Sequence, residues 1–178
     1  MPKNNRHGQA AVLSDQQLDR VRKQLKSRHH RLIFDIARFT GERAGAIVQL
    51  QTRDCYHDNR QPRDTITFRA QTRKARPGGR RETREVPVSD RLHEKLSAYS
   101  PPAHSLYLFP GEVGHISFSA FDKALRRAIA KAKMEHLGAS THSFRRSAAT
   151  KIGQVFDTKL YKSLWGGKIL EMPFATKR

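Results

Sequence analysis

The chain has a single cysteine, no long apolar run and few acidic side chains among its 178 residues. Cys55 cannot form an internal disulfide and has no neighbours at metal-ligand spacing, which predicts a reducing, intracellular setting and no metal site. No apolar stretch approaches the length of a membrane span, and the polar first nine residues lack the apolar centre of a signal peptide. These absences favour a cytoplasmic protein with no membrane partner.

Negative charge is scarce as well, with 16 Asp and Glu against 35 Lys and Arg and a formal net charge of +19. Such an excess hinders folding through self-repulsion unless the cations are spread out or meet a polyanion. Nucleic acid is the expected partner, because neutralising phosphates releases condensed counterions. Ribosomal RNA or an anionic membrane would satisfy the same charge. The length suits one domain with a core of its own.

Helical periodicity dominates the chain and predicts an α+β fold that is mostly α. Ser14 and Gln17 form a capping box before a helix expected over 15–26. The other expected helices lie over 32–41, 44–50, around Leu92 and Leu96, over 118–132 and from about 141 to 152. The apolar stripe from Phe118 to Ala132 is the clearest of these patterns, and we expect all of it to face the core.

Alternation of β-branched residues over 65–68 and 83–88, with a weaker pattern over 54–57, predicts a small three-stranded antiparallel sheet against the helices. A cation-rich Pro-Gly-Gly turn over 73–81 joins the last two strands. The chain is therefore expected to divide into a disordered basic N-terminus over 1–12, one folded domain over 13–154 and a divergent tail over 155–178.

Three basic segments have residue types that suit phosphoryl transfer, which needs positive donors on the equatorial oxygens, a proton for the leaving oxygen and an aligned nucleophile. Arg43 and Arg145 suit the first task, because a guanidinium fork binds two oxygens and stays charged. Lys74, in the hairpin, suits the second task, and His142 can assist proton transfer near neutral pH.

Each of these residues also has a purely structural interpretation. In a chain with 35 cations, Arg43 and Arg145 are compatible with solvated surface positions. His142 is placed to bond the backbone at a helix start, and the hairpin around Lys74 could hold phosphates without sequence preference.

The residues of these segments, and the order of the segments in the chain, resemble the motifs of one known family. Thr40-Gly41-Glu42-Arg43 resembles the first arginine box of tyrosine recombinases, the phage-type integrases. Thr72-Arg73-Lys74 followed by Arg84-Glu85-Val86-Pro87-Val88 looks like their second and third strands with the catalytic lysine between. Ser140-Thr141-His142-Ser143-Phe144-Arg145-Arg146-Ser147 is similar to their His-x-x-Arg box. The resemblance covers roughly Leu13 to Gly153.

The resemblance implies site-specific DNA recombination and integration, as carried out by mobile elements. A tyrosine would attack the scissile phosphate and form a 3′-phosphotyrosyl link, without metal, ATP or other cofactor. Arg43 and Arg145 would clamp the non-bridging oxygens, Lys74 would protonate the 5′-oxygen and His142 would assist. The expected partners are double-stranded DNA, with nucleoid association, and further copies of the chain in a homo-oligomer on DNA. The residues expected to contact DNA are Arg73, Arg76, Arg80, Arg81 and Arg146.

Two positions depart from the family pattern. Ala46 stands where the family usually carries an acidic residue, three positions after the first arginine. Tyr161 is the sole tyrosine after Arg145, 16 positions on and before Trp165, whereas the family places its nucleophile after a Gly-His or Trp element. The sequence leaves three hypotheses. The first is a recombinase catalytic domain with Tyr161 as a possible nucleophile, and the second is a noncatalytic DNA-binding relic or accessory protein. A basic RNA- or ribosome-associated protein is a third.

Overall fold

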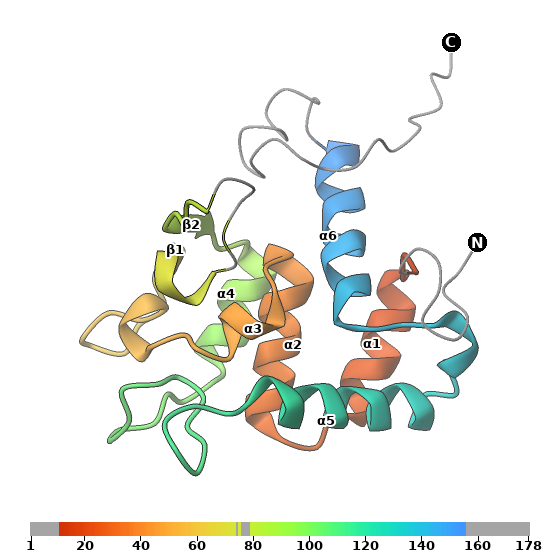
Figure 1. Ribbon diagram of the computed structural model, residues 1–178, viewed down its shortest axis with the longest axis horizontal. Coiled ribbons are helices and arrows are strands. Elements are labelled where there is room, and N and C mark those ends of the chain that lie inside the picture. Colours follow the sequence, from red (N-terminus) through yellow and green to blue (C-terminus); the bar gives the residue numbers. More distant parts are fainter. Residues whose placement is uncertain (1–10, 74, 76–78, 156–178) are drawn as a thin grey trace.

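The computed structural model describes residues 11–73, 75 and 79–155, and helices form most of this part of the chain (Figure 1). The helices are α1 (Asp15–Gln24), α2 (Arg28–Thr40), α3 (Ala44–Ile47), α4 (Asp90–Ser97), α5 (Phe118–Lys131) and α6 (Thr141–Val155). The strands are β1 (Thr65–Phe68) and β2 (Arg84–Pro87), and single 3-10 turns lie at Thr52–Asp54, Ala70–Thr72 and Glu135–Leu137. This is the mostly helical α+β architecture that the sequence predicts.

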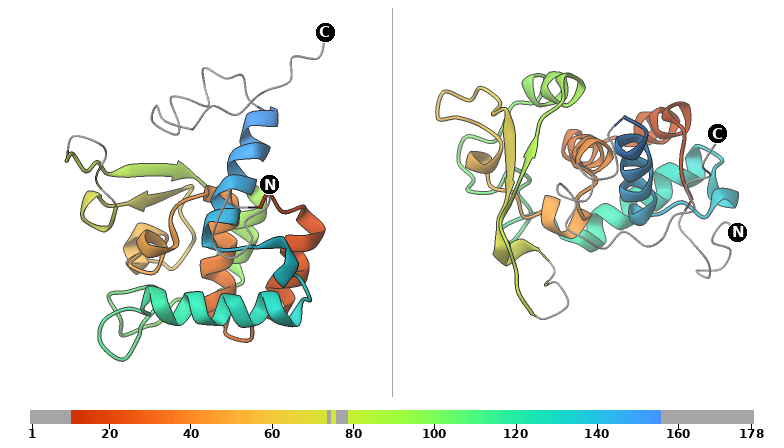
Figure 2. Two further views of the ribbon diagram at one scale, coloured as in Figure 1. Left: turned by 45° about the vertical axis from the view of Figure 1, so that its right-hand side comes forward. Right: turned by 90° about the horizontal axis from the view of Figure 1, so that it is seen from above.

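Helix α2 lies between the other elements and packs against α3, α4, α5 and α6. Its Leu32, Ile33 and Ile36 are buried, and the ring of Phe34 meets that of Phe144 on α6 edge-on, with ring centroids 4.7 Å apart. Helix α6 stands beside α2, α5 crosses beneath α1 and α2, and the sheet lies to the other side of α2 (Figures 1 and 2). The packing of α6 on α2 places the start of α6 close to the end of α2.

The sheet has two antiparallel strands, in which Ile66 pairs with Val86 and Phe68 with Arg84. Ile66 and Phe68 are buried and alternate with partly exposed threonines, as the period of two requires. Within the described residues, the third strand expected over 54–57 is reduced to a 3-10 turn and one isolated bridge from Tyr56 to Pro62. The Asp54 carboxylate accepts a bond from the Gln51 N–H at 2.8 Å, which favours a turn there over an extended strand.

Helix α5 corrects one expectation about the core. Its Phe121, Leu125 and Ile129 are buried, as the apolar stripe predicts, but Phe118 is 44% exposed. The prediction that Phe118 belongs to the core is wrong. It is the first residue of the helix, which the Ser117 side chain caps by accepting from the Ala120 N–H. Because α5 begins at Phe118, no earlier turn of the helix covers this side chain. The ring lies beside the start of α3.

Ion pairs join α1, α2 and α6 on the side away from the sheet. Arg38 of α2 bonds Asp15 at 2.7 Å and also Asp19, and Lys151 of α6 donates to the same Asp15 carboxylate. The bond from Lys151, followed by that from Arg38, lowers the pKa of Asp15 to about 2. No helix in the described part of the chain is both long enough and apolar enough to traverse a bilayer.

The Asp15 contacts predict a pH-dependent share of stability. Because the pKa of Asp15 falls from 3.8 to about 2 on folding, its contribution is complete above about pH 4 and disappears as the pH falls through 2. Asp15 is about half exposed, so this share is at most about 1 kcal/mol. Urea denaturation at pH 5 and pH 2 should show a smaller loss for Asp15→Asn than for the wild type. Asp122→Asn on α5, which leaves these contacts intact, should behave like the wild type, and equal losses in all three proteins would contradict the assignment.

Candidate active site

The segment from Thr40 to Arg43 makes a tight turn between α2 and α3. Gly41 ends α2 in the left-handed conformation, with φ +62°, and its N–H donates to Ala37 O at 3.0 Å. Thr40 donates its hydroxyl to Ile36 O at 2.6 Å and accepts from the Glu42 N–H at 3.2 Å. The turn buries Glu42 and leaves the Arg43 side chain exposed at the residue preceding α3.

Helix α6 supplies the second part of the site. Its buried side is fixed by Ser143, which accepts from the Ser140 N–H at 3.1 Å, and by Ser147, which accepts from the Leu13 N–H at 2.8 Å. His142 and Arg145 are three residues apart and therefore lie on one face of the helix. Phe144 packs on Phe34 of α2 and fixes the rotation of α6, and Arg145 reaches the α2–α3 turn, where its Nη1 lies 3.3 Å from Gly41 O.

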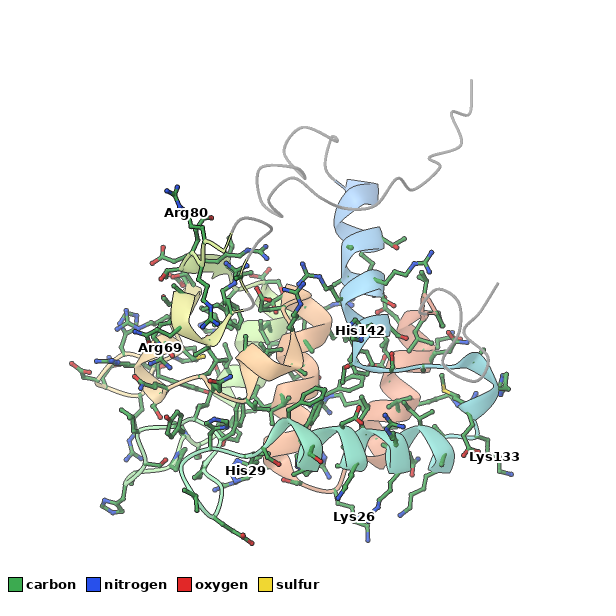
Figure 3. All side chains as sticks on the ribbon, viewed as in Figure 1. Lys26, His29, Arg69, Arg80, Lys133 and His142 are labelled. Atoms are coloured by element: carbon green, nitrogen blue, oxygen red, sulfur yellow. The ribbon has the colours of Figure 1, made fainter. Side chains whose placement is uncertain are left out.

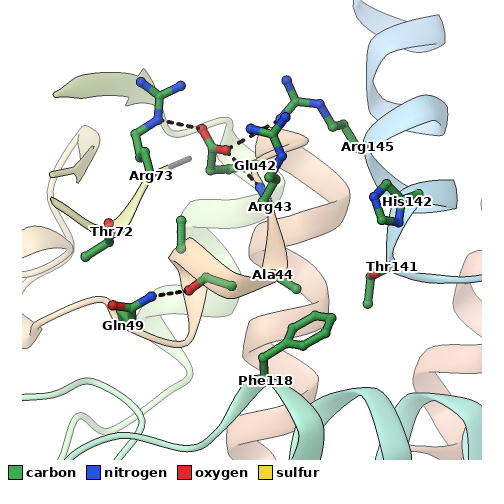
Figure 4. A pocket seen from close by; sticks show the side chains of 12 residues that line it. Glu42, Arg43, Ala44, Gln49, Thr72, Arg73, Phe118, Thr141, His142 and Arg145 are labelled. Carbon is green, nitrogen blue, oxygen red and sulfur yellow. Dashed lines mark hydrogen bonds and ion pairs between the residues drawn. The ribbon is translucent and has the colours of Figure 1, made fainter. Parts of the chain in front are cut away.

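Four segments that are distant in sequence line one cavity of about 300 Å³ (Figure 4). They are the α2–α3 turn with α3, the basic hairpin, the start of α5 and the start of α6. The charged and polar lining residues are Glu42, Arg43, Gln49, Thr72, Arg73, Thr141, His142 and Arg145. The small or apolar ones are Ala44, Gly45, Ala46 and Phe118. One wall of the cavity is therefore cationic, and another carries an aromatic ring beside small residues.

The buried Glu42 carboxylate lies among the cations of this wall, with its side chain 1% exposed. Its Oε1 accepts from the Arg43 N–H at 2.9 Å and lies 3.5 Å from Arg145 Nη1. Its Oε2 lies 3.4 Å from Arg73 Nε and 3.6 Å from Arg84 Nη1. Arg145 Nη1 also donates to Gly41 O at 3.3 Å. The hairpin, the α2–α3 turn and α6 therefore meet at this one acid.

The structure brings Arg43, His142 and Arg145 together, as the sequence hypothesis requires. Lys74, Arg76 and Tyr161 lie outside the described residues. Of the residues expected to contact DNA, Arg73 lines the cavity, pairs with Glu42 and donates to Glu82 O at 2.7 Å.

The other described residues expected to contact DNA do not line the cavity. Arg80 and Arg81 are exposed in the hairpin, and Figure 3 shows Arg80 pointing away from the body of the molecule. Arg81 also donates to Gln71 O at 3.1 Å. Arg146 is partly exposed on α6.

The sequence alone assigns no role to Glu42 and places Phe118 in the core rather than at a site. A usable signal existed for Glu42, since it is an acid beside the key arginine in a chain with few acids. Phe118 matched the apolar stripe of α5, and its exposed position gave no separate signal. Among the described residues, no three His, Cys, Asp or Glu side chains gather closely enough to hold a metal ion.

Three of the four tyrosines of the sequence are described, and none of them lines the cavity. Tyr56 and Tyr99 are buried and donate their hydroxyls to backbone carbonyls, and burial raises the pKa of Tyr56 and takes that of Tyr99 to about 12. The Tyr107 ring packs edge-on against His115, with centroids 5.1 Å apart. Of the tyrosines in this chain, only Tyr161 therefore stays a candidate nucleophile.

A mostly helical domain that brings two distant arginines and a histidine to one cavity is the arrangement that the resemblance to tyrosine recombinases leads us to expect. The chain matches the Phage integrase family over residues 11–164, and it belongs to that family. Comparison with curated proteins finds no match.

Solved structures share the fold. The chain is similar to the XerA recombinase at 18% identity and TM-score 0.66, with 88% of this chain and 56% of that chain covered. It is similar to the lambda integrase dimer bound to a core site at 15% identity and TM-score 0.66, covering 92% and 59%. For the catalytic domain of bacteriophage HP1 integrase the values are 19% and 0.60, covering 90% and 83%. The chain thus spans about half to three-fifths of the XerA and lambda integrase chains.

The left-handed turn at Gly41 predicts a contrast between two nearby glycines. Gly41→Ala places a β-carbon at φ +62° and should lower the free energy of unfolding by about 1–2 kcal/mol. Gly45→Ala, in α3, meets nothing within 4 Å and should be neutral or stabilise by up to about 1 kcal/mol. Urea denaturation measures both. Equal effects at the two positions would mean that the α2–α3 turn does not depend on Gly41.

Proposed function

We propose that this chain is the catalytic domain of a site-specific recombinase that cleaves and rejoins double-stranded DNA through a phosphotyrosine intermediate. The observation that carries the proposal is the shared cavity of Arg43, His142 and Arg145, from segments a hundred residues apart. Support also comes from similar structures solved on DNA: XerH with its difH substrate, lambda integrase with a core site and Tn1549 integrase with transposon right end DNA.

The chemistry follows from the charges at the cavity. A scissile phosphate placed there would receive two guanidinium forks, from Arg43 and Arg145, on its non-bridging oxygens. The tyrosine oxygen forms a bond to phosphorus while the bond to the 5′-oxygen breaks, and Lys74 supplies the proton that the leaving oxygen takes up. His142 assists by accepting the proton that the tyrosine hydroxyl loses as it attacks. Attack of a 5′-hydroxyl on the phosphotyrosine reverses these steps and rejoins the strand.

The nucleophile in this proposal is Tyr161. The other tyrosines are excluded by their burial or by their position away from the cavity. The proposal extends to a homo-oligomer on DNA, association with the nucleoid and origin in a mobile element. It keeps a folded domain over 13–154 between a basic N-terminus and a divergent tail over 155–178.

Removal of one guanidinium tests the clamp. Arg145→Ala should reduce formation of the covalent adduct on a nicked suicide substrate by about a hundredfold or more, since it removes a donor to the developing charge. Nonspecific affinity for DNA should remain largely intact, because many other phosphate contacts persist. Arg126→Ala, an exposed arginine on α5, is the matched control and should form wild-type amounts of adduct. Normal cleavage by Arg145→Ala would remove Arg145 from the site.

The tyrosine assignment has its own test. Tyr161→Phe should leave DNA affinity at matched salt unchanged and abolish the covalent adduct, because the attacking oxygen is gone. Gel electrophoresis under denaturing conditions separates the adduct from free DNA. An unchanged yield of adduct would exclude Tyr161.

The second candidate function is a noncatalytic DNA-binding protein that retains the phosphate clamp. It is favoured by the early position of Tyr161, only 16 residues after Arg145. Absence of any adduct from the wild type, with DNA binding retained, would select this candidate. Tighter binding of structured RNA than of duplex DNA at the same salt concentration would argue against both DNA functions.

A further inference from the structure

A buried acid at the centre of a basic site needs a physical reason. Glu42 is one of only 16 acidic residues in the chain, and its side chain is 1% exposed. Burial of an unpaired carboxylate is strongly unfavourable, and breaking a buried ion pair leaves a charge without compensation. Both carboxylate oxygens of Glu42 face positive partners, so the arrangement compensates its charge.

The same carboxylate compensates the arginines. Arg73 and Arg84 belong to the hairpin, and Arg145 belongs to α6, more than 60 residues further along the chain. Their guanidinium groups repel one another when they approach, and the repulsion grows as water is excluded. Arg73 and Arg84 are 15% and 14% exposed, so little solvent screens them. A shared anion between them removes the main obstacle to their convergence.

The contacts between Glu42 and the three arginines are short enough for charge attraction but longer than strong hydrogen bonds. The three guanidinium nitrogens lie 3.4 to 3.6 Å from the carboxylate oxygens. A closed charge-assisted bond measures about 2.7–2.9 Å. An incoming phosphate therefore has no short bond to Glu42 to break at these three contacts. The shortest contact of Glu42 is to the Arg43 N–H, which ties the anion to the turn that presents Arg43.

We infer that Glu42 is a positioning residue, whose buried carboxylate holds Arg145 and Arg73 at the shared cavity before any phosphate arrives. It acts through the guanidinium groups and touches no reacting atom. Since Arg73 immediately precedes Lys74 in the chain, the same contact restrains the start of the segment that carries the proposed acid. The consequence for cleavage rests on the proposed function, whereas the ordering of the arginines is a property of the DNA-free protein.

The first experiment uses Glu42→Gln, which keeps the shape of the side chain and removes its charge. In spectra of ¹⁵N-labelled DNA-free protein, the Nε–H signals of Arg73 and Arg145 should be dispersed in the wild type. In Glu42→Gln they should collapse toward the position of solvent-exposed arginines, while the Arg126 signal stays in place. Unchanged Arg73 and Arg145 signals in the variant would overturn the inference, whether or not the protein cleaves DNA.

The second experiment measures single-turnover cleavage at saturating suicide substrate. Glu42→Gln should lower the rate constant by about tenfold to a hundredfold, the usual effect of a small misplacement of catalytic groups, with unchanged DNA affinity and an unchanged shape of the pH profile. Leu92→Ala, at a buried residue of α4 that does not line the cavity, supplies a destabilised control and should cleave at the wild-type rate below its melting temperature. Wild-type cleavage by Glu42→Gln would contradict the positioning role.

If Glu42→Gln does not fold, Glu42→Asp provides a second test of the positioning role. It retains the charge and withdraws the carboxylate by one methylene, so the arginine signals should move part of the way toward solvent values. Signals identical to the wild type would count against the inference. A wild type that forms no adduct, together with collapsed arginine signals in the variants, would refute the proposed function and leave the inference standing.

Discussion

Guanidinium groups that face one cavity repel one another, and the DNA-free protein has to compensate that repulsion within its own fold. Only an anion can compensate this repulsion, and acidic residues are scarce in a chain of net charge +19. Glu42 is the acid that the structure places at this point, in contact with Arg73, Arg84 and Arg145. The position of this carboxylate determines how the hairpin and α6 can meet, and the cationic wall of the cavity depends on it.

The fold provides this arrangement through α2 and the turn that follows it. Helix α2 is buried on α6 through Phe34 and Phe144, which fixes the face of α6 that carries His142 and Arg145. The left-handed residue Gly41 then reverses the chain so that Glu42 points inward and Arg43 stays exposed. The geometry of the cavity thus follows from one helix–helix interface and one tight turn, with Arg73 added from the hairpin between β1 and β2.

Membership of the phage integrase family is combined here with two departures from the family pattern. Ala46 stands at the position of the usual acidic residue, and an acid four positions earlier, Glu42, contacts Arg73, Arg84 and Arg145. The tyrosines at 56, 99 and 107 do not line the cavity, which leaves Tyr161 as the candidate nucleophile. The first departure is thus accompanied by a buried acid nearby, and Tyr161 stays a candidate for the nucleophile.

Local patterns in the sequence were enough to predict the helices and the hairpin strands, and the resemblance of three motifs to one family predicted that Arg43, His142 and Arg145 come together, as they do at the cavity. Helical periodicity, capping residues and short motifs each involve residues only a few positions apart in the chain, so they can be recognised in a single sequence. The burial of Glu42, the exposure of Phe118 and the missing third strand were decided only by the tertiary structure. Each of these depends on which distant segments pack together, and a residue's type does not specify its neighbours in space.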